Sequence, residues 1–223
     1  MVDRQYHYLP WEDYLHVAAG AGKKVDPDGT LLPYYGNTVI YDLLDNTKDA
    51  LVQLQEKLYE SCGHFLSEKL TRESFHMTLH DLVSGTDREA VLERVNAISE
   101  EAKQTAEKAR GVVGNSMPMR PVKLVSMVST SVVLLLEPVY PVDRALLDMA
   151  YGMLQSVVPL NYGLTPHVTL AYYRPDTIAG ADLQILADTL SELSENLQFD
   201  VVLKYNKLHY REFYDMNHYV EGI

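Results

Sequence analysis

Two copies of a short motif, His-x-Thr, contain the residue types of this chain that could do chemistry together. The copies are Phe-His-Met-Thr-Leu at 75–79 and Pro-His-Val-Thr-Leu at 166–170. Successive side chains of a strand point to opposite faces, so His76 shares a face with Thr78, and His167 shares one with Thr169. Each strand therefore presents an imidazole and a hydroxyl on one polar face. Two such strands lying side by side would form a four-point site.

A pair of imidazoles supplies both proton transfers needed to open a 2′,3′-cyclic phosphate or to cleave a phosphodiester beside a ribose hydroxyl. One takes a proton from the nucleophile and the other gives one to the leaving oxygen, and the ordinary histidine pKa of ~6.5 makes both forms accessible. The threonine hydroxyls would donate hydrogen bonds to the non-bridging oxygens. We therefore expect His76, Thr78, His167 and Thr169 to be catalytic, without a metal or cofactor. Which histidine is the acid stays open.

Other interpretations compete with this one. A single His-x-Thr recurs by chance, but two copies with matching flanks argue against coincidence. A zinc centre would use the histidines as ligands, and His80 and Asp81 could join them if the strand bulges, although the helical His-Glu-x-x-His pattern is absent. Nucleophilic catalysis lacks a Gly-x-Ser-x-Gly segment, and Cys62 falls on the apolar face of a predicted helix.

Four further residues are candidates for substrate binding. Tyr173 shares a face with His167 by strand parity and could stack on a base. Asn37 and Tyr35 stand at the start of a predicted strand, where they could flank the groove. His80 has the same parity as the first motif histidine, and we place it at the rim of the site.

The composition limits the class of partner. The 223 residues carry a formal charge of −12, and no run approaches the ~18 apolar residues needed to cross a bilayer. Long duplex nucleic acid is bound mainly through Lys and Arg, so we expect a small phosphorylated ligand, such as a nucleotide or short oligonucleotide. One cysteine and no basic-then-apolar N-terminal segment fit a cytoplasmic protein that binds no membrane. The oligomeric state stays open.

The order of elements predicts an α+β fold of two pseudo-symmetric lobes. After a peripheral segment, residues 1–33, each half follows the order strand, helix, His-x-Thr strand, helix, with extra strands in the second half. We expect one bilobal domain over residues 34–223, with lobes at about 34–112 and 118–223 and a break within 111–119. Mainly antiparallel sheets would form a central groove with the helices outside.

Paired His-x-Thr strands about one lobe apart resemble the two-histidine (2H) phosphoesterase superfamily, which includes cyclic nucleotide phosphodiesterases and RNA 2′,5′ ligase-like proteins. Gly-Asn-Thr-Val at 36–39 and Ser-Phe-His-Met-Thr at 74–78 also look like an uncharacterised microbial branch of it. The resemblance covers residues 35–215 and implies a pseudo-twofold pair of lobes whose groove is lined by the four motif residues. The chain departs from the RNA ligase-like members at His80 and Tyr172, which bears on the substrate more than on the chemistry.

The resemblance and the motifs together predict a hydrolase, a metal-independent 2H-type phosphodiesterase acting on a cyclic phosphate, a cyclic nucleotide or a short oligonucleotide. The alternative is a non-catalytic nucleotide sensor that uses the same groove. A sensor should bind a phosphorylated ligand without turnover, whereas a structural protein with incidental histidines should show no coupling between the motifs. The natural substrate, the 2′ or 3′ product and the pathway stay open.

Overall fold

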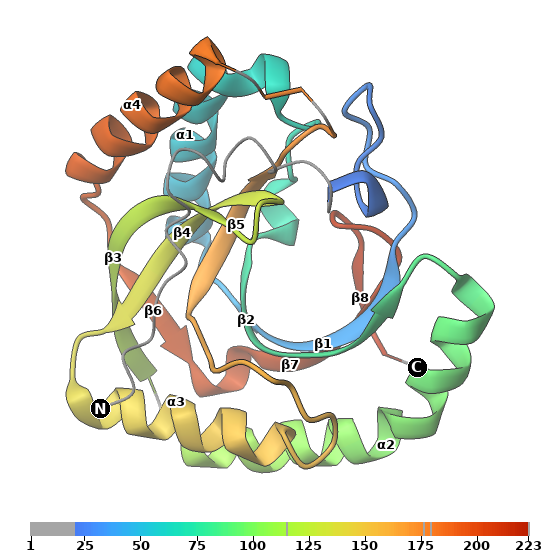
Figure 1. Ribbon diagram of the computed structural model, residues 1–223. Helices are drawn as coiled ribbons and strands as arrows, with labels where there is room; N and C mark the ends of the chain where they lie inside the picture. Colours follow the sequence, from blue (N-terminus) through green and yellow to red (C-terminus); the bar gives the residue numbers. More distant parts are fainter. Residues whose placement is uncertain (1–20, 115, 176, 179, 223) are drawn as a thin grey trace.

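The computed structural model describes residues 21–114, 116–175, 177–178 and 180–222, so part of the peripheral segment predicted for residues 1–33 lies outside it. In these residues the chain forms two four-stranded antiparallel sheets, and the first curls into a half-barrel (Figure 1). The first sheet has the order β2 (His76–Gly85), β1 (Tyr35–Asp42), β7 (Leu208–Phe213), β8 (Tyr219–Glu221). The second has the order β5 (His167–Tyr172), β4 (Ser131–Pro138), β3 (Ser116–Met127), β6 (Val201–Lys204).

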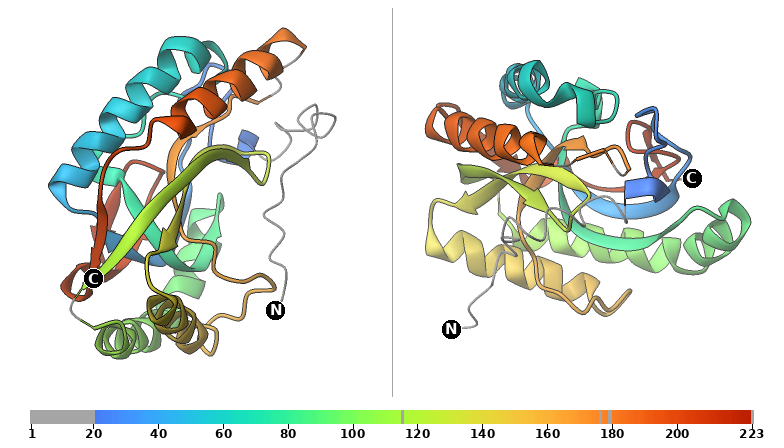
Figure 2. Two further views of the ribbon diagram at one scale, coloured as in Figure 1. Left: turned by 90° about the vertical axis from the view of Figure 1, so that its left-hand side faces the viewer. Right: turned by 45° about the horizontal axis from the view of Figure 1, so that its top comes forward.

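The helices lie outside the sheets in two pairs, as Figures 1 and 2 show. In one pair α1 (Asp45–Cys62) packs beside α4 (Ala181–Glu195), and in the other α2 (Arg88–Val112) packs beside α3 (Pro141–Leu154). The α+β class with antiparallel sheets and outer helices is confirmed. No helix of the described residues is both long and apolar enough to span a membrane.

The start of α2 and the buried face of α1 follow from their sequences. The Asp87 carboxylate caps α2 by accepting a hydrogen bond from the N–H of Ala90 at 3.1 Å, which satisfies one of the free donors of the first turn. In α1 the residues Leu51, Leu54 and Leu58 recur at helical spacing and are all buried. Both helices therefore present one apolar stripe to the core.

The two sheets do not follow the order of the chain. β7 and β8 come from the C-terminal end but join the sheet of β1, where Thr38 lies opposite Arg211. Conversely, α1 of the first half packs on α4 of the second. β3 begins at Ser116, inside the segment 111–119 predicted as a break, so the link that follows α2 is shorter than predicted. Each sheet and its helices thus contain residues from both halves.

The two His-x-Thr strands meet at the centre of the molecule. β2 and β5 are each the edge strand of their sheet, and they lie side by side. Both strands carry a bulge directly after the motif threonine, with Leu79 as the extra residue in β2 and Leu170 in β5. Buried side chains hold these irregular segments, because Thr38 donates to the His80 carbonyl at 3.0 Å and Gln55 donates to the Leu170 carbonyl at 2.9 Å.

Candidate functional site

The groove between the sheets contains all four residues of the duplicated motif. His76 and Thr78 line it from β2, and His167 and Thr169 line it from β5. Its volume is about 840 Å³, within the range that suits a small organic ligand. The strand parity expected from the sequence thus brings both imidazoles and both hydroxyls to one cavity.

Each motif histidine is held by the carbonyl two residues before it, just ahead of its strand. The Nδ1 atom of His76 lies 2.6 Å from the Ser74 carbonyl oxygen, and the Nδ1 atom of His167 lies 2.7 Å from the Thr165 carbonyl oxygen. A carbonyl oxygen can only accept, so Nδ1 carries the proton in both rings and donates it. The neutral ring then has an unprotonated Nε2 that can accept a proton, and the charged ring can give one from the same atom. The two copies offer chemically equivalent Nε2 atoms.

Burial lowers the pKa of both motif histidines. For His76 the loss of hydration is the main cause and brings the pKa to about 4, although the nearby Asp42 charge acts in the opposite direction. Burial is also the main cause of the lowered pKa of His167, where the Lys24 charge lowers it further and the Asp81 charge raises it. Both rings of the protein alone are therefore neutral at pH 7. A bound phosphate anion would favour the imidazolium form and raise both pKa values again.

Lys24 brings a positive charge into the groove that the sequence analysis did not predict. Its Nζ atom lies 5.0 Å from the ring centroid of Tyr172 and 5.1 Å from that of Tyr34. Of the described residues that line the groove, it has the only Lys or Arg side chain. Burial acts to lower the pKa of Lys24, but Tyr172, Tyr34 and Asp81 outweigh it and keep the pKa raised, so the group is charged at neutral pH. No motif or periodicity marks this residue in the sequence.

Aromatic rings form a wall along the groove, which we call the aromatic wall: Tyr34, Tyr172, Phe213 and Tyr219. The ring of Tyr219 lies 4.6 Å from that of His76, Phe213 lies 5.4 Å from Tyr219, and Tyr34 lies 6.2 Å from Phe213. At the end of the wall away from His76, the Lys24 ammonium lies close to the rings of both Tyr34 and Tyr172. No local sequence signal marks the wall, because its members are distant along the chain, on β5, β7, β8 and the segment before β1.

The bulges change which side chains of each strand face the groove. Because Leu170 is an extra residue, the alternation of β5 shifts by one after the motif, and Tyr172 rather than Tyr173 lines the groove. Tyr173 is fully buried in the core, so its predicted place beside the substrate is not found. Tyr35 also lies away from the groove, where its ring packs against the apolar cluster that contains Val83.

Asn37 and His80 do line the groove, and both are buried. The amide of Asn37 accepts from the Val83 N–H at 2.9 Å and donates to the Tyr210 hydroxyl at 3.0 Å. The first bond satisfies a backbone donor of β2 beside a register shift between β1 and β2, and the second links β1 to β7, so the role of Asn37 is structural. His80 packs its ring 4.8 Å from that of Tyr151, and both of its ring nitrogens are buried. Burial is the main cause of the lowered pKa of His80.

Asp81 brings a carboxylate into the groove because of the bulge at Leu79. It accepts a hydrogen bond at 3.0 Å from the hydroxyl of Tyr162, which lies in the loop before β5. This bond joins the two His-x-Thr regions across the groove. Asp81 is the position that a zinc cluster with His80 would have used. In the described part of the chain, no three His, Cys, Asp or Glu side chains are grouped so that they could hold a metal ion.

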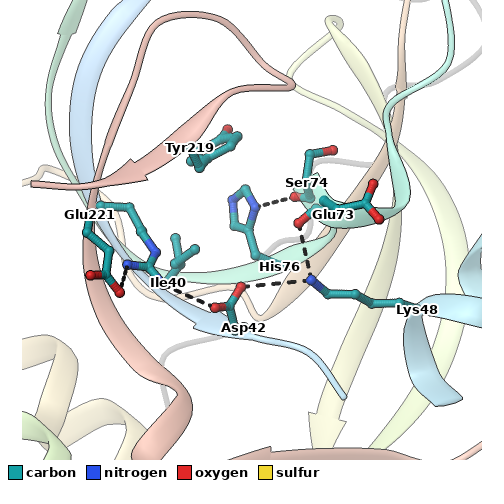
Figure 3. A pocket seen from close by; sticks show the side chains of 9 residues that line it. Ile40, Asp42, Lys48, Glu73, Ser74, His76, Tyr219 and Glu221 are labelled. Carbon is teal, nitrogen blue, oxygen red and sulfur yellow. Dashed lines mark hydrogen bonds and ion pairs between the residues drawn. The ribbon is translucent and has the colours of Figure 1, made fainter. Parts of the chain in front are cut away.

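A smaller pocket of about 270 Å³ adjoins the groove at His76, whose ring lines both cavities (Figure 3). The Asp42 carboxylate lies in this pocket between two cations, 3.9 Å from the Lys48 Nζ and 3.3 Å from an Arg211 nitrogen. Arg211 also pairs with Glu221 at 3.1 Å. These charges are satisfied by one another, so the cluster ties β1, β7, β8 and α1 together around the histidine.

This geometry defines an α+β protein in which two His-x-Thr strands, one at the edge of each sheet, converge on one groove. Residues 24–102 match the model of a family named 2H-phosphodiest and described as a domain of unknown function (DUF1868). The match supports the resemblance of these residues to the 2H phosphoesterase superfamily. It includes the first motif, whereas the second motif lies outside the matched residues. In the fold the two motifs occupy similar places, each on a strand at the edge of its sheet.

One of the solved structures to which the chain is similar supports the fold. The crystal structure of a conserved protein of unknown function from Agrobacterium tumefaciens aligns with a TM-score of 0.64 and 16% identity, over 95% of this chain and 98% of that one. Apo LigT of E. coli aligns with a TM-score of 0.47 and 13% identity, over 86% and 96% of the two chains. TT0787 of Thermus thermophilus gives a TM-score of 0.44 and 16% identity, over 65% and 76%. No curated protein matches the chain.

Proposed function

We propose that the protein is a metal-independent phosphodiesterase that opens or cleaves a cyclic phosphate, a cyclic nucleotide or a short oligonucleotide. The observation that carries this proposal is that both motif imidazoles are fixed by the same kind of hydrogen bond. Each ring donates its Nδ1 proton to the carbonyl two residues earlier, which leaves Nε2 as the proton-transfer atom. A pair of such rings in one groove is what acid and base catalysis at a phosphodiester requires.

For a 2′,3′-cyclic phosphate the proposed reaction is a hydrolysis. One neutral imidazole takes a proton from the attacking water as its oxygen forms a new bond to phosphorus. The other ring, charged in the complex, gives its proton to the ribose oxygen as the bond from that oxygen to phosphorus breaks. Thr78 and Thr169 donate hydrogen bonds to the non-bridging oxygens, where negative charge concentrates. The anionic substrate itself stabilises the imidazolium that burial disfavours.

The rest of the groove supports a nucleotide as the ligand. The aromatic wall offers ring faces on which a base can stack. The volume suits one or two nucleotides, and the acidic chain, with a formal charge of −12, disfavours long duplex nucleic acid. We place the protein in the cytoplasm, without a membrane partner, in line with its single, buried cysteine.

A nucleotide sensor is the second candidate, and one observation favours it. With a His76 pKa of about 4, the protein alone holds no charged imidazole ready to act as an acid at pH 7. A groove of this kind can bind a phosphorylated ligand without turnover. An enzyme needs the bound ligand to raise the pKa of one motif histidine, so that this ring can act as the acid. A sensor has no such requirement.

The test is a screen of purified protein against 2′,3′-cyclic nucleotides, 3′,5′-cyclic mono- and dinucleotides and short 2′,5′-linked oligonucleotides. The variants His76→Gln and His167→Gln should each lower kcat/KM by about 100-fold or more, because each removes one proton-transfer step. His64→Gln, an exposed histidine outside the groove, is the matched control and should keep full activity. Binding without turnover would favour the sensor, and neither binding nor turnover would contradict both.

A further inference from the structure

Lys24 is fixed by its backbone rather than carried on a free end of the chain. Its carbonyl accepts a hydrogen bond from the Leu32 N–H at 2.8 Å, and the next residue, Val25, is fully buried. The turn between Lys24 and Leu32 is attached to the segment before β2, because the Leu31 N–H donates to the Glu68 carboxylate at 2.8 Å. The lysine therefore enters the groove from an anchored loop, which limits the conformational freedom lost when it binds a ligand.

The surroundings of the Lys24 ammonium leave part of its hydrogen-bonding capacity open to a ligand. Two tyrosine rings lie about equally far from Nζ, at 5.0 and 5.1 Å. The Tyr172 side chain accepts one hydrogen bond from the ammonium, and ring faces attract a cation but are poor acceptors for its remaining N–H donors. Asp81, the carboxylate of the groove, accepts a hydrogen bond from Tyr162. The Asp81 charge attracts the ammonium without a direct ion pair among the described residues, so the remaining N–H donors can bind an anionic ligand in the same cavity.

Lys24 also lies beside the reacting part of the groove. It contacts Tyr172, which follows His167 and Thr169 on β5 and faces the same cavity. The Lys24 charge acts to lower the pKa of His167. An anion held by Lys24 would therefore lie within the groove next to the second motif rather than at a remote surface.

We propose that Lys24 binds a non-bridging oxygen of the scissile phosphate, next to His167 and Thr169, and so selects anionic phosphodiesters. This inference rests on the proposed function. An ammonium bound to a phosphoryl oxygen makes a charge-assisted hydrogen bond, which strengthens as negative charge builds on that oxygen. The same charge favours the neutral form of His167, which is the form that acts as the base.

The test compares Lys24→Met, which keeps the apolar stem, with Lys24→Arg, which keeps the charge. Lys24→Met should lower kcat/KM about 10- to 100-fold, and Lys24→Arg should restore part of the loss. Lys23→Met is the matched control, because it removes the same charge from the adjacent, exposed residue. Loss of the Lys24 charge should also raise the pKa of His167 and move the acidic limb of the kcat/KM profile to higher pH.

Several outcomes separate this proposal from the proposed function. An equal effect of Lys24→Met and Lys23→Met would overturn it, and so would a loss confined to substrates that carry an additional phosphate. If the wild type turns over no substrate, the phosphodiesterase fails, but Lys24 is still tested by the Kd for inorganic phosphate, measured from the phosphate dependence of thermal unfolding. We expect about 10-fold weaker phosphate binding in Lys24→Met, and an unchanged Kd would overturn the proposal. If Lys24→Met does not fold, Lys24→Gln takes its place in both assays.

Discussion

At the scale of the residue, the two motif histidines have equivalent hydrogen bonds but different charges around them. Asp42 lies near His76 and acts to raise its pKa, whereas Lys24 acts to lower the pKa of His167. A reaction with one acid and one base needs such a difference. If Lys24 has the proposed role, its charge favours neutral His167 as the base, and the Asp42 charge favours protonated His76 as the acid. Because burial outweighs the Asp42 charge in the protein alone, the bound phosphate must supply the remaining stabilisation of the imidazolium.

The lowered histidine pKa values predict a loss of stability in mild acid. Between pH 6.5 and about 4 the unfolded chain binds a proton at His76 that the folded chain does not, so the free energy of unfolding falls as pH falls. The loss from this residue begins near pH 6.5 and ends near the folded pKa of about 4. Urea unfolding at pH 7 and pH 5 should differ by on the order of 1 kcal/mol more in the wild type than in His76→Gln. His64→Gln is the control, and a His76→Gln protein with the wild-type pH dependence would contradict this prediction.

At the scale of the element, the sequence predicts strands and helices well because their signals are local. The alternation around His76 and His167 places both side chains correctly. The bulge at Leu170 has no such signal, since it depends on pairing with β4, so the parity prediction for Tyr173 is wrong. Lys24 was missed for a related reason. Its contacts with Tyr172 and Tyr34 arise only when distant segments pack together.

Gly36 of β1 lies between β2 and β7, where close packing leaves no room for a side chain. A Cβ atom added at Gly36 would lie 2.3 Å from the Val83 carbonyl oxygen and 2.5 Å from Phe213. Gly36→Ala should therefore lower the free energy of unfolding by about 1–3 kcal/mol, through overpacking. Gly152→Ala is the matched control, because nothing lies within 4 Å of its added Cβ and the residue is in α3. This control should gain about 0.5–1 kcal/mol from helix propensity. Equal urea midpoints for the two variants would count against the crowding at Gly36.

At the scale of the whole molecule, the two lobes are interwoven rather than joined end to end. β7 and β8 complete the first sheet, α1 packs on α4, and Arg110 of α2 donates to the Leu208 carbonyl of β7 at 2.8 Å. The groove lies between these shared layers, with one motif strand from each sheet. Its geometry therefore depends on both sheets being folded at once. The predicted division into lobes at about 34–112 and 118–223 would cut across the first sheet.

This arrangement predicts that the chain unfolds as one cooperative unit. Removing the contacts of one lobe exposes a face of the other, so neither sheet has a complete set of partners by itself. Native-state hydrogen exchange, followed by mass spectrometry on peptides from β1 and β4, should give the same free energy of opening for the two strands. The variant Gly36→Ala makes the test sharper, because its substitution lies in β1 only. It should lower the protection of β4 as much as that of β1. Protection lost from β1 alone would mean that the lobes open independently, and the groove would then be a contact between two separately stable parts.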